Sequence, residues 1–296
     1  MRTATETIGD ARVVKAYLTR DELLTEEIVP DELATGRAQW TYGEAQTLAE
    51  TLRRLRANEP TERQRAAYEI AREELAAATA DLVDVATRRR RRRIYSDDGD
   101  ALDVGRYLAD PERPYWSRLT RTAHAGRVVT LNVDVAANAA QHERTFARLG
   151  ALAAAAVDVL AAAGIGTDVR LCDSSCEILG CMTTWIGISV PWCSPDQPLD
   201  PGALAAVGMP GLLRASLMGA EVAAVESAGL SRHRDEWTRV YGSASPWPAE
   251  VRDALYPPGE ILLAARNAGA GDAARMVTVL RGLLGAEALD GAEVAA

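Results

Sequence analysis

One short apolar stretch constrains the fold of this chain more than any other feature. Residues 127–137 read R-V-V-T-L-N-V-D-V-A-A, and five of the positions from 128 to 135 are valine or leucine. A run with so little polar alternation indicates a β-strand buried on both faces. Asp134 stands near its end, and a short polar turn leads into a long helical pattern. A strand, a loop and a helix in this order begin a parallel α/β layer, in which ligands bind at the carboxyl ends of the strands.

The segments that follow complete this α/β pattern. Apolar residues at helical spacing predict a long helix over 141–163. Strands are predicted over 169–172 and 183–190, close enough in the sequence to pair as an antiparallel hairpin at the sheet edge. A late buried strand over 260–265 and a last helix beginning at Asp272 follow. We therefore predict an α/β fold with a small, mostly parallel sheet, an antiparallel edge strand and flanking helices, which is a Rossmann-like arrangement.

The N-terminal third is predicted to be helical. Apolar positions three and four residues apart indicate helices over 43–57 and 61–87, and Thr61 with Gln64 forms a capping box at the start of the second helix. The break at 58–60 joins two seams of equal spacing, which predicts an antiparallel helical hairpin whose seams bury each other. The alternative is that the hairpin also offers a face to a partner chain.

These patterns divide the chain into four segments. Residues 1–90 form an N-terminal helical region that contains the hairpin over 43–87. Residues 91–124 form a charged connector, and the α/β domain follows over 125–285. Residues 286–296 form a frayed tail.

A run of six arginines follows the predicted hairpin. An acidic stretch from Asp97 to Asp103 comes within a few residues of it. One interpretation is a basic helix end, favoured by the helix dipole and neutralised by the acidic stretch. The alternative is a phosphate-binding clamp, because guanidinium groups match phosphate oxygens. The run consists of Arg88, Arg89, Arg90, Arg91, Arg92 and Arg93.

The overall charge argues against a general nucleic-acid or membrane binder. A net charge of −9 gives a negative field around most of the protein, although one local basic patch is compatible with it. The sequence contains no uncharged apolar run of about 18 residues, so no transmembrane helix is predicted. The first ten residues also lack the apolar core of a secretory signal. We therefore expect a cytoplasmic protein with free thiols and no membrane contact.

Several features of residues 91–284 occur together in a known family. They are the buried strand ending in aspartate, the long amphipathic helix, the second strand, the edge hairpin strand, and the late buried strand before a closing helix. This part of the chain resembles a reduced von Willebrand factor A-like domain. The lead-in D-D-G-D-A-L-D-V-G-R-Y-L, ending at Leu108, and P-L-D-P-G-A-L-A, from Pro198 to Ala205, also resemble proteins of actinobacterial phages and prophages. That second resemblance implies a phage or mobile-element setting and no particular activity.

The first resemblance implies a divalent-metal site that is incomplete in this chain. The von Willebrand family binds metal through an Asp-x-Ser-x-Ser motif, and the matching positions are Asp134, Ala136 and Asn138. A hard cation needs several oxygen ligands, and alanine supplies none. Asp173 and Ser174, after the second strand, are further candidate ligands. We expect a degenerate site without a cofactor; Asp134, Asn138 and Asp173 are the residues that would hold a divalent cation if one binds.

Catalytic motifs are sparse in this sequence. The four cysteines lack the paired short spacings of a zinc site, and none of the three histidines lies in a recognisable catalytic motif. No Walker-type phosphate loop or dinucleotide fingerprint occurs either. The residues concerned are Cys172, Cys176, Cys181, Cys193, His124, His142 and His233.

The sequence therefore favours a non-enzymatic interaction module with a protein partner, because the von Willebrand scaffold serves protein contacts in its family. Two alternatives stay open. The first is a nucleic-acid-associated protein that uses the arginine run. The second is a hydrolase or thiol enzyme that relies on Cys172, Cys176 and His142.

Overall fold

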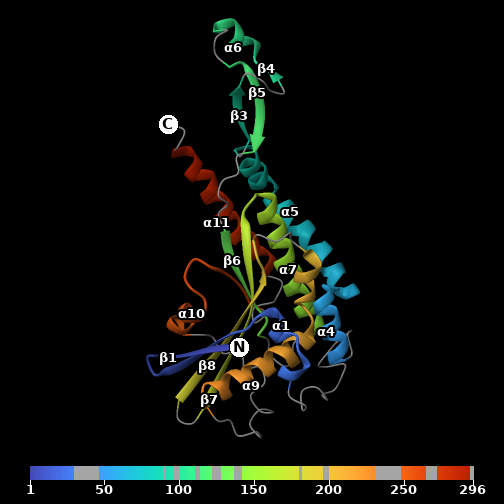
Figure 1. The fold of residues 1–296 in the computed structure, drawn as a ribbon, viewed down its shortest axis with the longest axis vertical. Coiled ribbons are helices and arrows are strands. Elements are labelled where there is room, and N and C mark those ends of the chain that lie inside the picture. Colours follow the sequence, from blue (N-terminus) through green and yellow to red (C-terminus); the bar gives the residue numbers. More distant parts are fainter. Residues whose placement is uncertain are drawn as a thin grey trace.

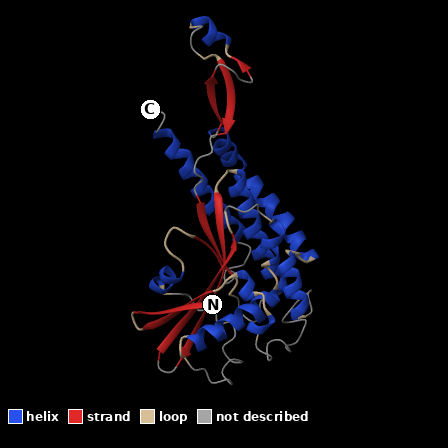
Figure 2. Cartoon of the chain, in the orientation of Figure 1, coloured by secondary structure: helices blue, strands red, loops and turns tan. Residues whose placement is uncertain are grey.

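The computed structural model contains a six-stranded sheet with most helices on one side, and a small three-stranded sheet that projects beyond the end of a long helix (Figures 1 and 2). The structure describes residues 1–29, 47–89, 91–96, 101–110, 114–121, 128–136, 142–179, 182–195, 200–230, 248–264 and 272–293.

The six-stranded sheet confirms the predicted α/β class. Its strands in spatial order are β1 (Arg2–Ile8), β2 (Ala11–Tyr17), β8 (Met182–Cys193), β7 (Gly166–Leu179), β6 (Val128–Asp134) and β9 (Ile261–Ala264). The pairs β2/β8, β7/β6 and β6/β9 are parallel, whereas β1/β2 and β8/β7 are antiparallel. The expected hairpin of β7 and β8 is present. The antiparallel strand at the sheet edge is β1, because β1 and β2 extend the sheet beyond β8.

The N-terminal strands correct the prediction that residues 1–90 are a separate helical region. Strand β2 pairs in register with β8, with Val13 opposite Trp185 and Val14 opposite Ile186. Both valines are fully buried, on opposite faces of the sheet. The partner strand lies about 170 positions away in the sequence, so no local pattern could reveal this pairing.

One face of the sheet carries nearly all the described helices. They are α1 (Arg20–Leu23), α4 (Leu48–Ala57), α5 (Glu62–Arg89), α7 (Glu143–Ala162), α8 (Pro201–Ala206), α9 (Met218–Ser227) and α11 (Asp272–Glu293), with the short helix η1 (Glu26–Ile28) and the π-helical segment η3 (Leu212–Leu217). Helix α10 (Ala249–Leu255) lies on the other face, where Val251 packs against Val13 and Trp185. The tail predicted from residue 286 is helical as far as Glu293.

The two N-terminal helices form, but they pack on different partners than expected. The capping box is present: the Thr61 N–H donates to Gln64 Oε1 at 2.7 Å, and the Gln64 N–H donates to Thr61 Oγ1 at 3.4 Å. Helix α5 packs mainly on α7 and α11, whereas α4 packs on α8, η1 and η3. Leu52 of α4 and Leu75 of α5 both join the main core. The seams therefore face the α/β core, which offers a larger apolar surface than they offer each other.

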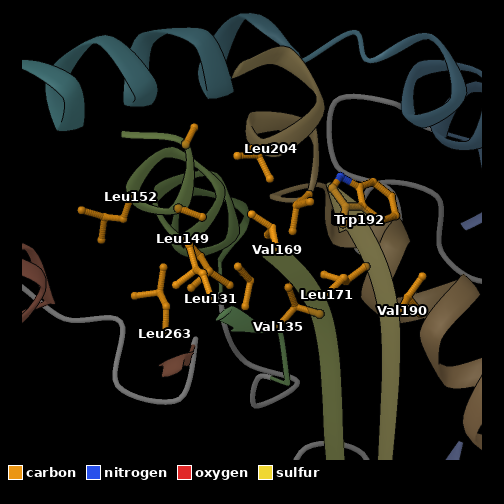
Figure 3. Close-up of a cluster of buried hydrophobic side chains, with 14 of the residues drawn as sticks. Leu131, Val135, Leu149, Leu152, Val169, Leu171, Val190, Trp192, Leu204 and Leu263 are labelled. Atoms are coloured by element: carbon orange, nitrogen blue, oxygen red, sulfur yellow. The ribbon is translucent and has the colours of Figure 1, made fainter. Parts of the chain in front are cut away.

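Helix α7 is the centre of the core. Leu149 and Leu152 pack among Leu131, Val169 and Leu263, contributed by three strands of the sheet (Figure 3). Among the described residues, α7 is the one helix long and apolar enough to cross a membrane, but 72% of its most apolar window is buried inside the protein. Its composition is thus explained by packing in the core.

The segment 91–124, predicted to be a charged connector, contains a second sheet. Strand β3 (Arg91–Ser96) pairs antiparallel with β5 (Trp116–Arg121), and β5 pairs with the short strand β4 (Ala101–Leu102). Helix α6 (Val104–Ala109) follows β4. We call the described residues of 91–121 the arm; it projects at the top of Figure 1, beyond the end of α5.

Close packing at Gly150 yields the first prediction. A Cβ at this position would lie 2.7 Å from Ala205 O and 2.8 Å from Gly208 N. Gly150→Ala should therefore lower the free energy of unfolding by about 1–3 kcal/mol, because α7 and α8 must separate. Gly282→Ala in α11 is the matched control: no atom lies within 4 Å of its Cβ position, and alanine should add about 0.5–1 kcal/mol of stability in a helix. Urea unfolding followed by circular dichroism measures both, and equal stabilities would contradict this account.

Candidate functional site

Asp134 lies at the carboxyl end of β6 as expected, and it is completely buried. Its Oδ1 accepts a hydrogen bond from the Ala136 N–H at 2.9 Å. Its Oδ2 accepts one from the Ser174 hydroxyl, also at 2.9 Å. The carboxylate therefore links the end of β6 to the following turn and to β7. Such bonds stabilise a buried carboxylate without any cation.

Of the other predicted metal ligands, Ser174 lies beside Asp134, whereas Asp173 does not. Ser174 shares a face of β7 with Cys172, which pairs with Asp134, and Asp173 points to the opposite face because side chains alternate along a strand. Asn138 lies outside the described residues. Within the part of the chain that the structure describes, no three His, Cys, Asp or Glu side chains are grouped as a metal site requires.

The face of the sheet away from the helical layer is polar beyond the apolar cluster under α10. On β6, Thr130, Asn132 and Asp134 alternate with apolar residues that face the helices. This spacing is a signal that sequence reasoning missed: the strand is buried on both faces near its end, as expected, but polar groups line one face. Paired residues of adjacent strands share a face. The polar sheet face consists of Lys15, Tyr17, Thr130, Asn132, Asp134, Asp168, Arg170, Cys172, Ser174 and Ser189.

Side chains on the polar sheet face bind one another. Asn132 Nδ2 donates to Glu260 Oε2 at 2.6 Å, and Arg170 Nη1 lies 3.8 Å from Glu260 Oε1. Arg170 Nε also donates to Asp168 Oδ2 at 3.1 Å. The guanidinium of Arg170 thus has two carboxylates close by. This arrangement holds β6, β7 and the start of β9 together.

A small pocket lies over the polar sheet face, beside α10. Its volume is about 180 Å³, and its lining includes Lys15, Asn132, Arg170, Ser189 and Leu255. Sites for drug-sized organic molecules usually begin near roughly 300 Å³. The pocket therefore suits water or a small ion better than an organic substrate.

Two of the described thiols, Cys172 and Cys193, lack the surroundings of a nucleophile. Burial raises the pKa of Cys172 well above its ordinary value of 9.0, and burial raises the pKa of Cys193 to about 11. A reactive cysteine needs the opposite shift, because the thiolate is the nucleophile. His142 is exposed at the N-cap of α7. Burial thus argues against Cys172 as the nucleophile of the thiol enzyme considered from the sequence. Cys181, His124 and His233 lie outside the described residues.

The tip of the arm is held by its own side-chain contacts. The Tyr95 hydroxyl donates to Asp103 Oδ2 at 2.9 Å, and Asp103 Oδ1 accepts from the Arg106 N–H at 3.0 Å, which caps α6. The Arg106 guanidinium carbon lies 4.2 Å from the centre of the Tyr95 ring. Tyr107 and Tyr115 pack edge to face, with ring centres 4.8 Å apart. These contacts fix α6 against β3 and the start of β5.

Apolar side chains are exposed around this tip. Leu102, Val104, Tyr107 and Leu108 are 46%, 54%, 42% and 75% exposed, and we call these four residues the apolar tip. They are four of the eight large apolar side chains that are exposed in the described part of the chain. This concentration within seven positions distinguishes the tip from the rest of the surface. Sequence reasoning treated residues 91–124 as a charged connector and did not foresee this exposure.

The arginine run spans two elements of the arm's base. Arg88 and Arg89 end helix α5, whereas Arg91–Arg93 begin β3, and the remaining arginine of the run lies outside the described residues. A basic helix end therefore accounts for only part of the run. Strand β5 adds Arg118 and Arg121, which sequence reasoning missed because they lie some 25 positions further along. Antiparallel pairing brings the two groups together.

A family model covers most of this architecture. The model described as a domain of unknown function (DUF7192) matches residues 26–279. The chain belongs to the DUF7192 family. The match includes the arm, the central part of the sheet and most of the helical layer of this DUF7192 protein, and it begins after β2. Comparison with curated proteins and with solved structures gave no significant match.

The hydrogen bond between Ser174 and Asp134 yields the second prediction. Ser174→Ala should lower the free energy of unfolding by about 1–3 kcal/mol, because Asp134 Oδ2 loses a donor in a buried site. Ser175→Ala is the control at the next position, where the hydroxyl has no hydrogen-bond partner among the described residues. That change should leave stability equal or slightly higher. Equal losses for both variants in urea unfolding would refute the assigned role of Ser174.

Proposed function

We propose that this DUF7192 protein is a non-enzymatic protein-interaction module whose contact surface is the apolar tip of the arm. The main support is the solvent exposure of four apolar side chains, those of Leu102, Val104, Tyr107 and Leu108. The tip stands at the far end of a projecting element, away from the main core (Figure 1). A concentration of exposed apolar side chains on a folded protein is typical of a site that contacts another molecule.

The internal contacts of the tip support this proposal. Asp103 caps α6 and binds Tyr95, while Arg106 covers the Tyr95 ring. A surface that is already ordered loses less conformational entropy when it binds. A short helix with an exposed tyrosine and leucine is thus well suited to fill an apolar groove on another protein.

Charge near the tip indicates the chemistry of the partner. Asp97, Asp98, Asp100, Asp110 and Glu112 are all close to the apolar tip in the sequence. Opposite charges at the rim of an interface speed association and exclude wrong partners. We therefore expect a partner with an apolar groove bordered by basic residues.

In this proposal the six-stranded sheet and its helices form the scaffold that carries the arm. We infer that it is a divergent von Willebrand A-like domain with a degenerate metal site, in a cytoplasmic protein of phage or mobile-element setting. The spatial order β8-β7-β6-β9 corresponds to the 3-2-1-4 order of doubly wound sheets, counted from β6. The phage setting is supported by the sequence patterns around Leu108 and Pro198.

Metal binding provides the third prediction. Both oxygens of Asp134 already accept hydrogen bonds, and Ala136 and Asp173 offer no ligand beside it. Titration calorimetry of the full chain with Mg²⁺ or Mn²⁺ at millimolar concentration should therefore show no stoichiometric binding. Stoichiometric binding that disappears in Asp134→Ala or in the isosteric Asp134→Asn would overturn the degenerate site.

Loss of the apolar tip provides the fourth prediction. The triple variant Leu102→Ser, Val104→Ser, Leu108→Ser should reduce recovery of the partner at least roughly tenfold, because buried apolar contacts supply much of the binding energy at an interface. The control is Ile70→Ser with Val128→Ser, two residues of the body that are 61% and 51% exposed.

The measurement is affinity capture of the tagged protein from its native cells, with nuclease, quantified by mass spectrometry. A captured protein is then purified and titrated against wild type and both variants. A partner that binds all three chains equally well places the contact elsewhere.

A further inference from the structure

The base of the arm is a strongly basic β-ribbon. Strands β3 (R-R-R-I-Y-S) and β5 (W-S-R-L-T-R) contain five arginines and no acidic residue in twelve positions. Two more arginines, Arg88 and Arg89, end the helix that leads into β3. This concentration stands out in a chain whose net charge is −9. The surface is separate from the apolar tip and independent of the function proposed for it.

The strand register brings like charges together. Arg91 lies directly opposite Arg121, and Arg93 belongs to the same face of the ribbon. Arg92 and Arg118 belong to the other face. Like charges at opposed positions destabilise a strand pair. A polyanion bound to the ribbon would remove this repulsion.

We propose that the β3–β5 ribbon binds the phosphate backbone of duplex DNA. Guanidinium groups match phosphate oxygens, and a two-stranded β-ribbon fits the major groove of B-DNA. The major groove of A-form RNA is too narrow for side chains to enter, so the ribbon should prefer DNA. The acidic residues around the tip are repelled by phosphate, which directs the tip away from the duplex.

An alternative reading is that the arginines only protect an open sheet edge. In the described part of the arm, β3 is paired on one side alone, and charged residues on such strands prevent unwanted strand pairing. This reading does not explain Arg118 and Arg121 on β5, the central strand of this small sheet. The two readings differ in whether DNA binds.

Fluorescence anisotropy of the full chain with a labelled 20-base-pair duplex tests the proposal. Three phosphate contacts, made by the arginines of one ribbon face, predict that affinity falls roughly 40-fold between 50 and 200 mM salt, from a slope of about −2.7 in the logarithmic plot. The variant Arg91→Gln, Arg93→Gln, Arg118→Gln, Arg121→Gln should lose this binding. It should remain folded, because the change removes repulsion; urea unfolding checks this.

The matched control removes four arginines from the body. Arg63, Arg72, Arg252 and Arg281 have side chains 48%, 51%, 52% and 51% exposed. Changing these four to glutamine alters the net charge equally. The fold should persist, because exposed ion pairs contribute little to stability. DNA affinity should stay within about twofold, because these arginines lie outside the ribbon. Salt-insensitive binding, or equal loss in the two variants, would overturn the proposal. Binding to single strands or duplex RNA at least as tight as to duplex DNA would overturn the assigned ligand.

Discussion

The fold depends on how closely helix α7 approaches its neighbours. Thirteen of its twenty residues are buried, and most of them are alanine, glycine or another small residue. Gly150 brings α7 against Ala205 and Gly208, while α5 and α11 pack along other sides of the helix. A helix surrounded in this way is apolar over most of its surface. The same composition that makes α7 resemble a membrane span thus makes it the axis on which the sheet and the helical layer meet.

The sheet is asymmetric, and this asymmetry explains its polar side. Among the described residues the helical layer covers one face, and α10 covers part of the other. Buried polar groups on the second face need partners, which Asp134 finds in Ser174 and Asn132 finds in Glu260. The aspartate at the end of β6 therefore has a structural role, at the position where related architectures bind ligands.

The arm carries two kinds of surface, one at its tip and one at its base. Its tip is apolar and internally braced, and its base is a basic ribbon without acidic residues. Both features depend on antiparallel pairing of β3 with β5, which turns a charge run into a two-stranded surface. The arm projects beyond α5, so a partner can contact it without disturbing the core (Figure 1).

The sequence by itself determined the elements whose signals are local. The strand ending at Asp134, helix α7, the β7–β8 hairpin and the capping box at Thr61 follow from periodicity and capping within short windows. It also named Asp173 and Ser174 as candidate neighbours of Asp134, but it did not distinguish between them, and the structure places Ser174 there. These predictions succeed because each segment must bury one face, and each helix must supply hydrogen-bond partners for its terminal backbone groups. Both requirements can be seen within the segment itself.

Only the tertiary structure decided which segments meet. Pairing of β2 with β8, packing of α5 on α7, and the junction of Arg91 with Arg121 join residues far apart in the sequence. The position of Asp173 on the face opposite Asp134 was decided the same way, by strand register. A shift of one residue moves every side chain to the other face. The physical reason is that the apolar pattern of a segment predicts which of its faces will be buried. Which other segment covers that face depends on the competition among all the apolar surfaces of the folded chain.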